Sequence, residues 1–239
     1  MDEQTKRKMI VNYFKSFPKW AIVLIVIGVP LLAAKGLGIL FIALGILVIV
    51  LYVKGMPTDQ QMDAWLEEDL KTVSGKAMGK AGHDQSEIVA DPVSIIGVRL
   101  WDTGGACVLF KQGKDSVIRF SPVSVTHIMF TQNQLSIYSS LLDRTTGNFL
   151  NESTDEYFYK DVVAVSTKTQ SKTVNTTQWG TLQLNAAETF ELTTAGGTSV
   201  SVLMRDPTLI DKMGGGQLPD TRAEKAIQTI RKMLREKKA

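Results

Sequence analysis

The sequence predicts a transmembrane helical hairpin followed by an α+β, mainly-β domain. We expect that domain to be an antiparallel half-barrel or sandwich capped by a C-terminal helix. Three observations lead to this fold class. Residues 20–53 contain 28 apolar residues among 34, although the mean hydropathy of the whole chain is only +0.02. Residues 91–205 alternate between apolar and polar over short runs, separated by turns rich in Gly, Asn and Asp. An amphipathic helical repeat follows at 221–237.

The apolar run 20–53 is too long for one straight membrane span. A helix of this length would measure about 51 Å, whereas the hydrocarbon core of a bilayer is about 30 Å thick. Lys35-Gly36-Leu37-Gly38 interrupts the run with two turn-forming glycines and a lysine that can reach the membrane surface. We therefore expect two arms, Trp20–Ala34 and Ile39–Val53. The alternative is a signal peptide ending near Ala34, followed by a core helix.

Positive charges flank the predicted hairpin at both ends. Five lie in residues 1–19, and Lys54 follows the second arm. The positive-inside rule therefore predicts an integral inner- or plasma-membrane protein with both termini and the β domain in the cytoplasm. A single cysteine, Cys107, excludes a disulfide framework and agrees with a reducing compartment.

The N-terminal arm, residues 1–19, has the pattern of a short basic amphipathic helix. Its apolar residues recur at helical spacing among the cations Lys6, Arg7, Lys8, Lys15 and Lys19. A helix of this kind lies on anionic lipid headgroups, so the five cations are candidate membrane-surface residues. The alternative is a disordered positive flank that only sets the topology.

Residues 55–90 carry seven acidic and three basic side chains and predict an acidic amphipathic helix with a Gly/Lys linker. Thr58 and Gln61 fit a capping box at the helix start. Met62, Trp65, Leu66 and Leu70 form one apolar stripe, which packs either on its own domain or on a partner or second copy. The glycines and lysines of residues 75–82 predict a flexible linker that leads into a domain at 91–239.

The C-terminal domain resembles a known superfold. The segment Glu156–Ser166 reads as a strand, a polar Lys160-Asp161 step and a small apolar strand, and Thr221 with Glu224 forms a second capping box before the helix 221–237. Over about residues 94–237 this arrangement resembles bacterial membrane-anchored proteins with a pleckstrin-homology-like domain. The resemblance implies a scaffold or an oligomerisation module.

Residue patterns for catalysis are sparse. The two histidines, His83 and His127, belong to no metal-binding motif, and Gly214–Gly216 lacks the ending of a phosphate-binding loop. We expect His127 to lie on a strand face and Cys107 to be buried and inert. The sequence thus predicts no enzyme activity, no cofactor, no metal site and no nucleic-acid partner.

Three functions remain open at this point. The leading hypothesis is a membrane-anchored cytoplasmic scaffold that forms homo-oligomers or docks a protein partner. The second is an anionic-lipid sensor, in which Lys111, Lys114 and Arg119 around the first hairpin hold a headgroup phosphate. The third is an accessory subunit of a membrane transport or secretion complex, whose small residues allow other helices to approach closely: Gly28, Gly36, Gly38, Ala43 and Gly45.

Overall fold

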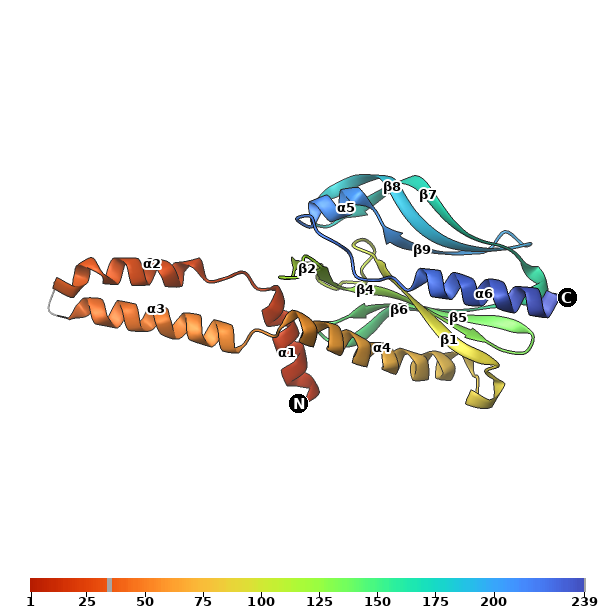
Figure 1. Cartoon of the computed structure of the whole chain (residues 1–239), viewed down its shortest axis with the longest axis horizontal. Helices are drawn as coiled ribbons and strands as arrows, with labels where there is room; N and C mark the ends of the chain where they lie inside the picture. Colours follow the sequence, from red (N-terminus) through yellow and green to blue (C-terminus); the bar gives the residue numbers. More distant parts are fainter. Residues whose placement is uncertain (34–35, 239) are drawn as a thin grey trace. The chain divides into compact units, whose positions relative to one another are not determined.

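The computed structural model describes residues 1–33 and 36–238 (Figure 1). The chain divides into two compact units, Met1–Met62 and a second unit that begins at Asp63. Each unit is described by itself. Of the predicted hairpin connection, Ala34 and Lys35 lie outside the described residues.

The first unit consists of helices. These are α1 (Glu3–Phe14), α2 (Lys19–Gly28), the 3₁₀ turn η1 (Pro30–Ala33) and α3 (Leu37–Lys54). Asp2 caps α1 by accepting a hydrogen bond from the backbone nitrogen of Thr5 at 2.6 Å. The α-helix α2 ends just before Pro30, which has no backbone N–H to continue it.

Helices α2 and α3 lie side by side (Figure 1) because small residues line their contact. Ala21, Gly28, Gly38 and Gly45 are all buried. A Cβ atom added to Gly45 would lie 2.7 Å from the carbonyl oxygen of Ala21, and one added to Gly28 would lie 2.9 Å from the carbonyl oxygen of Gly38. The two backbones can approach this closely only where side chains are absent.

Helix α3 has the length and composition of a membrane-crossing helix. The long helical segment that begins at Leu37 contains an 18-residue window of mean hydropathy 2.7, of which 11% is buried within the protein. The predicted second arm, Ile39–Val53, lies inside α3. Within the described residues, a second candidate exists only if α1 and α2, which meet at a 70° bend, are taken together as one broken span.

Helix α4 (Asp59–Ala81) begins as predicted and ends later than predicted. The capping box is confirmed: the Thr58 nitrogen donates to Gln61 Oε1 at 2.9 Å, and the Gln61 nitrogen donates to Thr58 Oγ1 at 3.2 Å. The prediction of a flexible linker over residues 75–82 was wrong, because α4 continues through Gly75 and Gly79 to Ala81.

Tertiary contacts keep the second half of α4 helical. Val73 and Ala77 are fully buried in the core beneath the helix. Lys76 Nζ lies 3.1 Å from Glu152 Oε1 and 4.5 Å from the centroid of the Phe149 ring. These contacts outweigh the cost of two helical glycines, each about 1 kcal/mol relative to alanine.

The second unit contains three antiparallel sheets, which confirms the predicted α+β class with antiparallel strands. The strands are β1 (Ala90–Val98), β2 (Leu109–Gln112), β3 (Ile118–Ser121), β4 (Val123–Phe130), β5 (Gln134–Asp143), β6 (Asn148–Phe158), β7 (Val162–Thr176), β8 (Gly180–Thr194) and β9 (Ser199–Arg205). Their orders are β1-β4-β5-β6, β2-β3 and β7-β8-β9. The remaining elements are the 3₁₀ turns η2 (Gln85–Glu87) and η3 (Tyr159–Asp161) and the helices α5 (Pro207–Lys212) and α6 (Ala223–Lys238).

The four-stranded sheet buries both faces, because side chains alternate along each strand. On one face, Val125, Met129 and Tyr138 belong to the cluster that includes the second half of α4. On the other face, residues such as Ile128 and Phe130 contact α6 and the sheet β7-β8-β9. Helix α6 therefore lies between the two larger sheets (Figure 1), with Ala226 and Ile230 fully buried.

Candidate functional site

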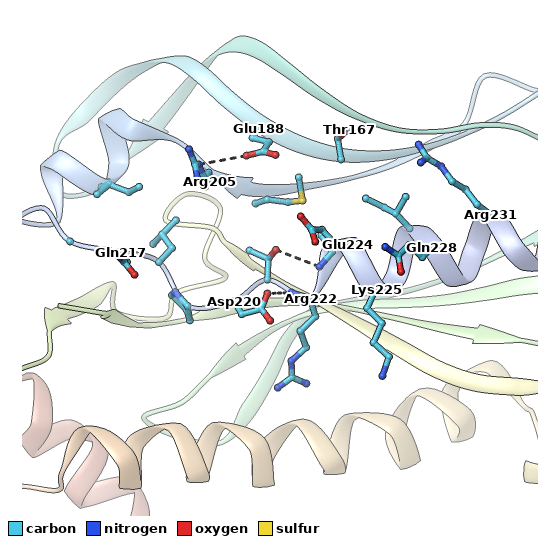
Figure 2. A pocket seen from close by; sticks show the side chains of 18 residues that line it. Thr167, Glu188, Arg205, Gln217, Asp220, Arg222, Glu224, Lys225, Gln228 and Arg231 are labelled. Carbon is cyan, nitrogen blue, oxygen red and sulfur yellow. Dashed lines mark hydrogen bonds and ion pairs between the residues drawn. The ribbon is translucent and has the colours of Figure 1, made fainter. Parts of the chain in front are cut away.

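A cleft of about 1010 Å³ lies between α6 and the sheet β7-β8-β9 (Figure 2). We call it the α6 cleft. Its walls come from segments far apart in the sequence: Thr167 on β7, Glu188 on β8, Arg205 on β9, and the chain from Gly216 to Arg231. The second unit alone supplies all of these residues.

The floor of the α6 cleft is apolar and its rim is charged. Met204 and Ile227 are 6% and 7% exposed, respectively, and form part of the core beneath the cleft. Glu224, Ile227 and Arg231 recur at the spacing of one helix face. Figure 2 shows Glu224 and Arg231 on the side of α6 that faces the sheet, whereas Arg222 and Lys225 point away from it.

The charged residues in the α6 cleft include both signs. Glu188 Oε2 lies 3.6 Å from Arg205 Nε, and both side chains are largely exposed. Arg231 donates to the carbonyl oxygen of Val165 on the outer strand β7 at 3.2 Å. Because these interactions are solvated, they cost little to rearrange around a ligand.

The segment that enters α6 is fixed by backbone hydrogen bonds. Gln217 donates to Ser116 at 2.9 Å and accepts from Ile118 at 2.7 Å, while Ile96 donates to Thr221 at 2.9 Å. Gly216 has a φ of +102°, and a Cβ atom there would lie 2.5 Å from the carbonyl oxygen of Ser116. The glycine is thus required for the close approach that places this wall of the α6 cleft.

The lining of the α6 cleft holds titratable side chains of both signs. Its carboxylates are Glu188, Asp220 and Glu224, and its cations include Arg205, Lys225 and Arg231. Over the described ranges, no group of three or more His, Cys, Asp or Glu side chains could hold a metal ion. An apolar centre with a polar rim also occurs in protein–protein interfaces.

The predicted headgroup residues are brought together only in part. Lys111 and Arg119 are opposite one another in the β2–β3 register, as expected for the first hairpin. Arg119, however, is 3% exposed and donates to Asp63 Oδ2 and Asp115 Oδ2, each at 2.7 Å. The prediction that Arg119 holds a lipid phosphate was wrong, because its guanidinium already donates hydrogen bonds to two carboxylates. Lys111 is half-buried and Lys114 is exposed.

One of the two carboxylates that bind Arg119 could not be identified from local sequence. Asp63 lies 56 residues from Arg119 in the chain, and only the packing of α4 brings it near. Asp115 is four residues from Arg119. The hydrogen bond from the Arg119 guanidinium holds the pKa of Asp115 well below its usual range.

The predicted partner face on α4 is largely covered by the chain itself. Leu70 is 6% exposed and belongs to the core cluster, and Leu66 packs against that cluster. Met62 is fully buried and Trp65 is half-buried. The stripe therefore serves intramolecular packing, which was the first of the two expected uses.

The five N-terminal cations differ in exposure. Lys6 is 4% exposed, which contradicts its assignment as a membrane-surface residue. Arg7 is half-buried and forms an ion pair with Glu3 within α1. Lys8, Lys15 and Lys19 are exposed.

The two histidines and the cysteine lie in different environments. Cys107 is exposed, so the expectation of a buried thiol was wrong; it lies in an irregular segment before β2. His83 Nε2 lies 2.6 Å from Ser136 Oγ, and its Nδ1 lies 2.9 Å from Glu87 Oε2. His127 lies on β4, with Nδ1 2.8 Å from Ser94 Oγ, and burial lowers its pKa to about 4.

Sequence reasoning missed the α6 cleft. The available signal was the glycine run Gly214–Gly216 followed by Pro219 and the charged first turns of the last helix, which we had interpreted as a simple turn. The residues from β7, β8 and β9 carry no local signal, because their common position depends on the sheet. Comparison with protein-family models, with curated proteins and with solved structures found no match for this chain.

Proposed function

We propose that this protein is a membrane-anchored interaction protein whose C-terminal domain docks a protein segment in the α6 cleft. The observation that carries the proposal is the α6 cleft itself, an open groove with an apolar floor and charges of both signs in a chain that also has an exposed apolar helix. The function assigned is binding rather than catalysis.

Figure 1 and the packing of α6 support the proposed resemblance to a pleckstrin-homology-like domain. Two antiparallel sheets enclose one helix at the C-terminal end of the chain, and the helix contributes to the core of both. On this proposal α6 has two roles: its buried face stabilises the domain, and the face with Glu224 and Arg231 recognises the partner.

The membrane anchor is proposed to be the α2–α3 hairpin, crossing the membrane twice with both termini in the cytoplasm. Two aromatic residues at the base of the hairpin support this placement. Tyr52 donates to the carbonyl oxygen of Lys15 at 3.1 Å, and its ring lies 5.4 Å from that of Phe17, centroid to centroid. Aromatic and basic side chains of this kind are typical of the membrane–water interface.

Cys107 provides a test of the proposed topology, because it is the only cysteine and it is exposed. In right-side-out membrane vesicles, a membrane-impermeant maleimide is expected to leave Cys107 unlabelled until the vesicles are lysed. A Leu37→Cys variant in a Cys107→Ser background is expected to react without lysis, because Leu37 begins α3 at the hairpin connection and is 58% exposed. Labelling of Cys107 in intact vesicles would contradict the cytoplasmic placement.

Docking in the α6 cleft is tested by photo-crosslinking in the native membrane. A benzoylphenylalanine residue at Gln228, which lines the α6 cleft, is expected to give a discrete adduct that mass spectrometry identifies as a protein segment. The matched control is the same residue at Lys232, which is on α6, is 70% exposed and does not line the α6 cleft. Equal adducts from both positions, or none from Gln228, would refute docking in the α6 cleft.

A charge reversal tests whether the charged rim of the α6 cleft contributes to docking. Glu224→Lys is expected to lower the adduct yield from Gln228 several-fold, because it changes a charge on the rim of the α6 cleft. Lys232→Glu, a charge reversal at an exposed position of α6 that does not line the α6 cleft, is expected to leave the yield unchanged. An adduct with a second copy of the chain would identify the docked segment as its own.

The two other functional hypotheses receive less support from the packing. The lipid-sensor hypothesis requires Arg119 to bind a headgroup phosphate, but the Arg119 guanidinium is hydrogen-bonded to Asp63 and Asp115. The accessory-subunit hypothesis relied on small residues as a contact surface for other helices. Three of them, Gly28, Gly38 and Gly45, are instead buried in the contact between α2 and α3.

A further inference from the structure

A second cavity, of about 460 Å³, is lined by residues of β1, β4, β7 and β9 and of the segment that follows β1. We call it the inter-sheet pocket. One wall consists of Ser124 on β4 and the chain that follows β1, including Arg99 and Trp101; the other consists of Lys172 on β7 and Ser201 on β9. Its volume is within the range of small-molecule sites, about 300–1,000 Å³.

The two strands that meet here approach unusually closely. A Cβ atom on Gly97 of β1 would lie 2.6 Å from the carbonyl oxygen of Leu203 on β9. The contact brings one edge of each sheet together and leaves the inter-sheet pocket beside it. Rigid strands rather than mobile loops therefore position the side chains of Ser124 and Ser201.

Arg99, one of two cations that line the inter-sheet pocket, forms only a long ion pair with Asp102, which also lines the pocket. Arg99 has a buried Nε with no hydrogen-bond partner among the described residues, and its guanidinium approaches Asp102 Oδ2 only to 3.7 Å. The Asp102 side chain is 75% exposed, so water screens this pair. An Nε–H buried without an acceptor is uncommon in native structures, and a ligand oxygen would satisfy it.

Lys172 has a fixed position but no anionic partner. It shares a face of β7 with the buried Val174, two residues away. Its Nζ lies 5.5 Å from the centroid of the Trp101 ring, a cation–π contact that holds the ammonium at the pocket. Across the described residues, the Lys172 ammonium makes no ion pair.

We propose that the inter-sheet pocket binds the phosphate group of a small ligand. Arg99 and Lys172 supply the positive charge, and the hydroxyl groups of Ser124 and Ser201 supply neutral donors. A phosphate has enough oxygen acceptors to use these donors together, whereas a carboxylate has two oxygens. The phosphate is carried either by a soluble metabolite or by a lipid headgroup. This inference does not rest on docking in the α6 cleft.

Calorimetric titration of the full chain in an uncharged detergent tests the proposal. The probes are inorganic phosphate, adenosine monophosphate and dihexanoyl phosphatidic acid, with acetate for comparison. We expect saturable binding of at least one phosphate compound and weaker binding of acetate. Tighter binding of adenosine monophosphate would identify a soluble ligand, and tighter binding of dihexanoyl phosphatidic acid would identify a lipid headgroup.

Paired variants locate the binding. Lys172→Gln is expected to weaken phosphate binding about tenfold, the effect of losing one charged hydrogen bond. Lys168→Gln, on the same strand but paired with Glu191 and outside the pocket, is expected to change it by less than about twofold. Arg99→Gln is expected to match Lys172→Gln, with circular dichroism confirming that it folds.

Tryptophan fluorescence gives an independent signal. Binding is expected to change the fluorescence emission of Trp101. The Trp101→Phe variant is expected to lose this fluorescence change but still to release or absorb heat when the phosphate compound binds in the calorimeter. The proposal is overturned if none of the phosphate probes gives saturable heat, if acetate binds as tightly as they do, or if Lys168→Gln weakens binding as much as Lys172→Gln.

Discussion

Replacing Gly45 by leucine is expected to separate α2 from α3. The new side chain would begin 2.7 Å from the carbonyl oxygen of Ala21 and 2.6 Å from Ile25 Cγ1. Ile25 can change its rotamer, but the Ala21 oxygen belongs to the backbone, so the helix itself must move. Overpacking of this kind typically costs about 1–3 kcal/mol. In this chain the overpacking destabilises the contact between α2 and α3.

Thiol crosslinking measures the separation. Phe17 and Tyr52 are in contact at the base of the hairpin, with ring centroids 5.4 Å apart, so Phe17→Cys with Tyr52→Cys in a Cys107→Ser background is expected to be joined by a short bis-maleimide reagent. Adding Gly45→Leu is expected to lower the crosslink yield several-fold. Ala43→Leu adds a leucine two residues away at an exposed position and serves as the control. Unchanged yield with Gly45→Leu would show that the glycine is not required for packing.

The stability of the folded chain is expected to fall by about 2 kcal/mol between pH 7 and pH 5 because of His127. Burial lowers the pKa of His127 to about 4 in the folded protein, whereas an unfolded histidine has a pKa near 6.5. Between these two values the unfolded chain binds a proton that the folded chain does not. The contribution is therefore complete above about pH 6.5 and is lost as the pH falls toward 4.

Urea unfolding of the detergent-solubilised chain at the two pH values, followed by circular dichroism, measures the effect. His127→Gln is expected to remove most of the difference in unfolding free energy between pH 7 and pH 5. This expectation does not depend on how the substitution changes stability at pH 7. The carboxyl groups with lowered pKa values do not compete in this window: Asp2, Glu87, Asp115 and Glu152. Their stabilisation is present above the unfolded pKa, about 4, and is lost only at lower pH. Equal pH dependence in His127→Gln and the parent would contradict the assignment to His127.

Local sequence patterns were sufficient where the structure depends on neighbours in the chain. The Thr58–Gln61 capping box forms as predicted, because both partners lie within one helical turn. Lys111 and Arg119 lie opposite one another because a short hairpin turn fixes their register. The apolar run 39–53 lies in a helix long enough to cross a membrane.

Predictions were wrong where distant residues decide the outcome. The glycine-containing half of α4 is helical because Val73 and Ala77 are buried against the sheet, a contact invisible in the local composition. Arg119 looked like a free cation because Asp63 is 56 residues away. The α6 cleft was not predicted because β7, β8, β9 and α6 each contribute only a few of its residues.

The sequence by itself determined which segments are apolar, which are strands and which ends are capped, because these properties depend on side-chain periodicity and on hydrogen bonds within a few residues. Only the tertiary structure decided which charges remain available to a ligand. Arg119 donates hydrogen bonds to two carboxylates at 2.7 Å, whereas Arg99 has only a solvated ion pair at 3.7 Å and Lys172 contacts the Trp101 ring. The physical reason is that charge pairing depends on distance in space, which is set by packing across segments far apart in the chain.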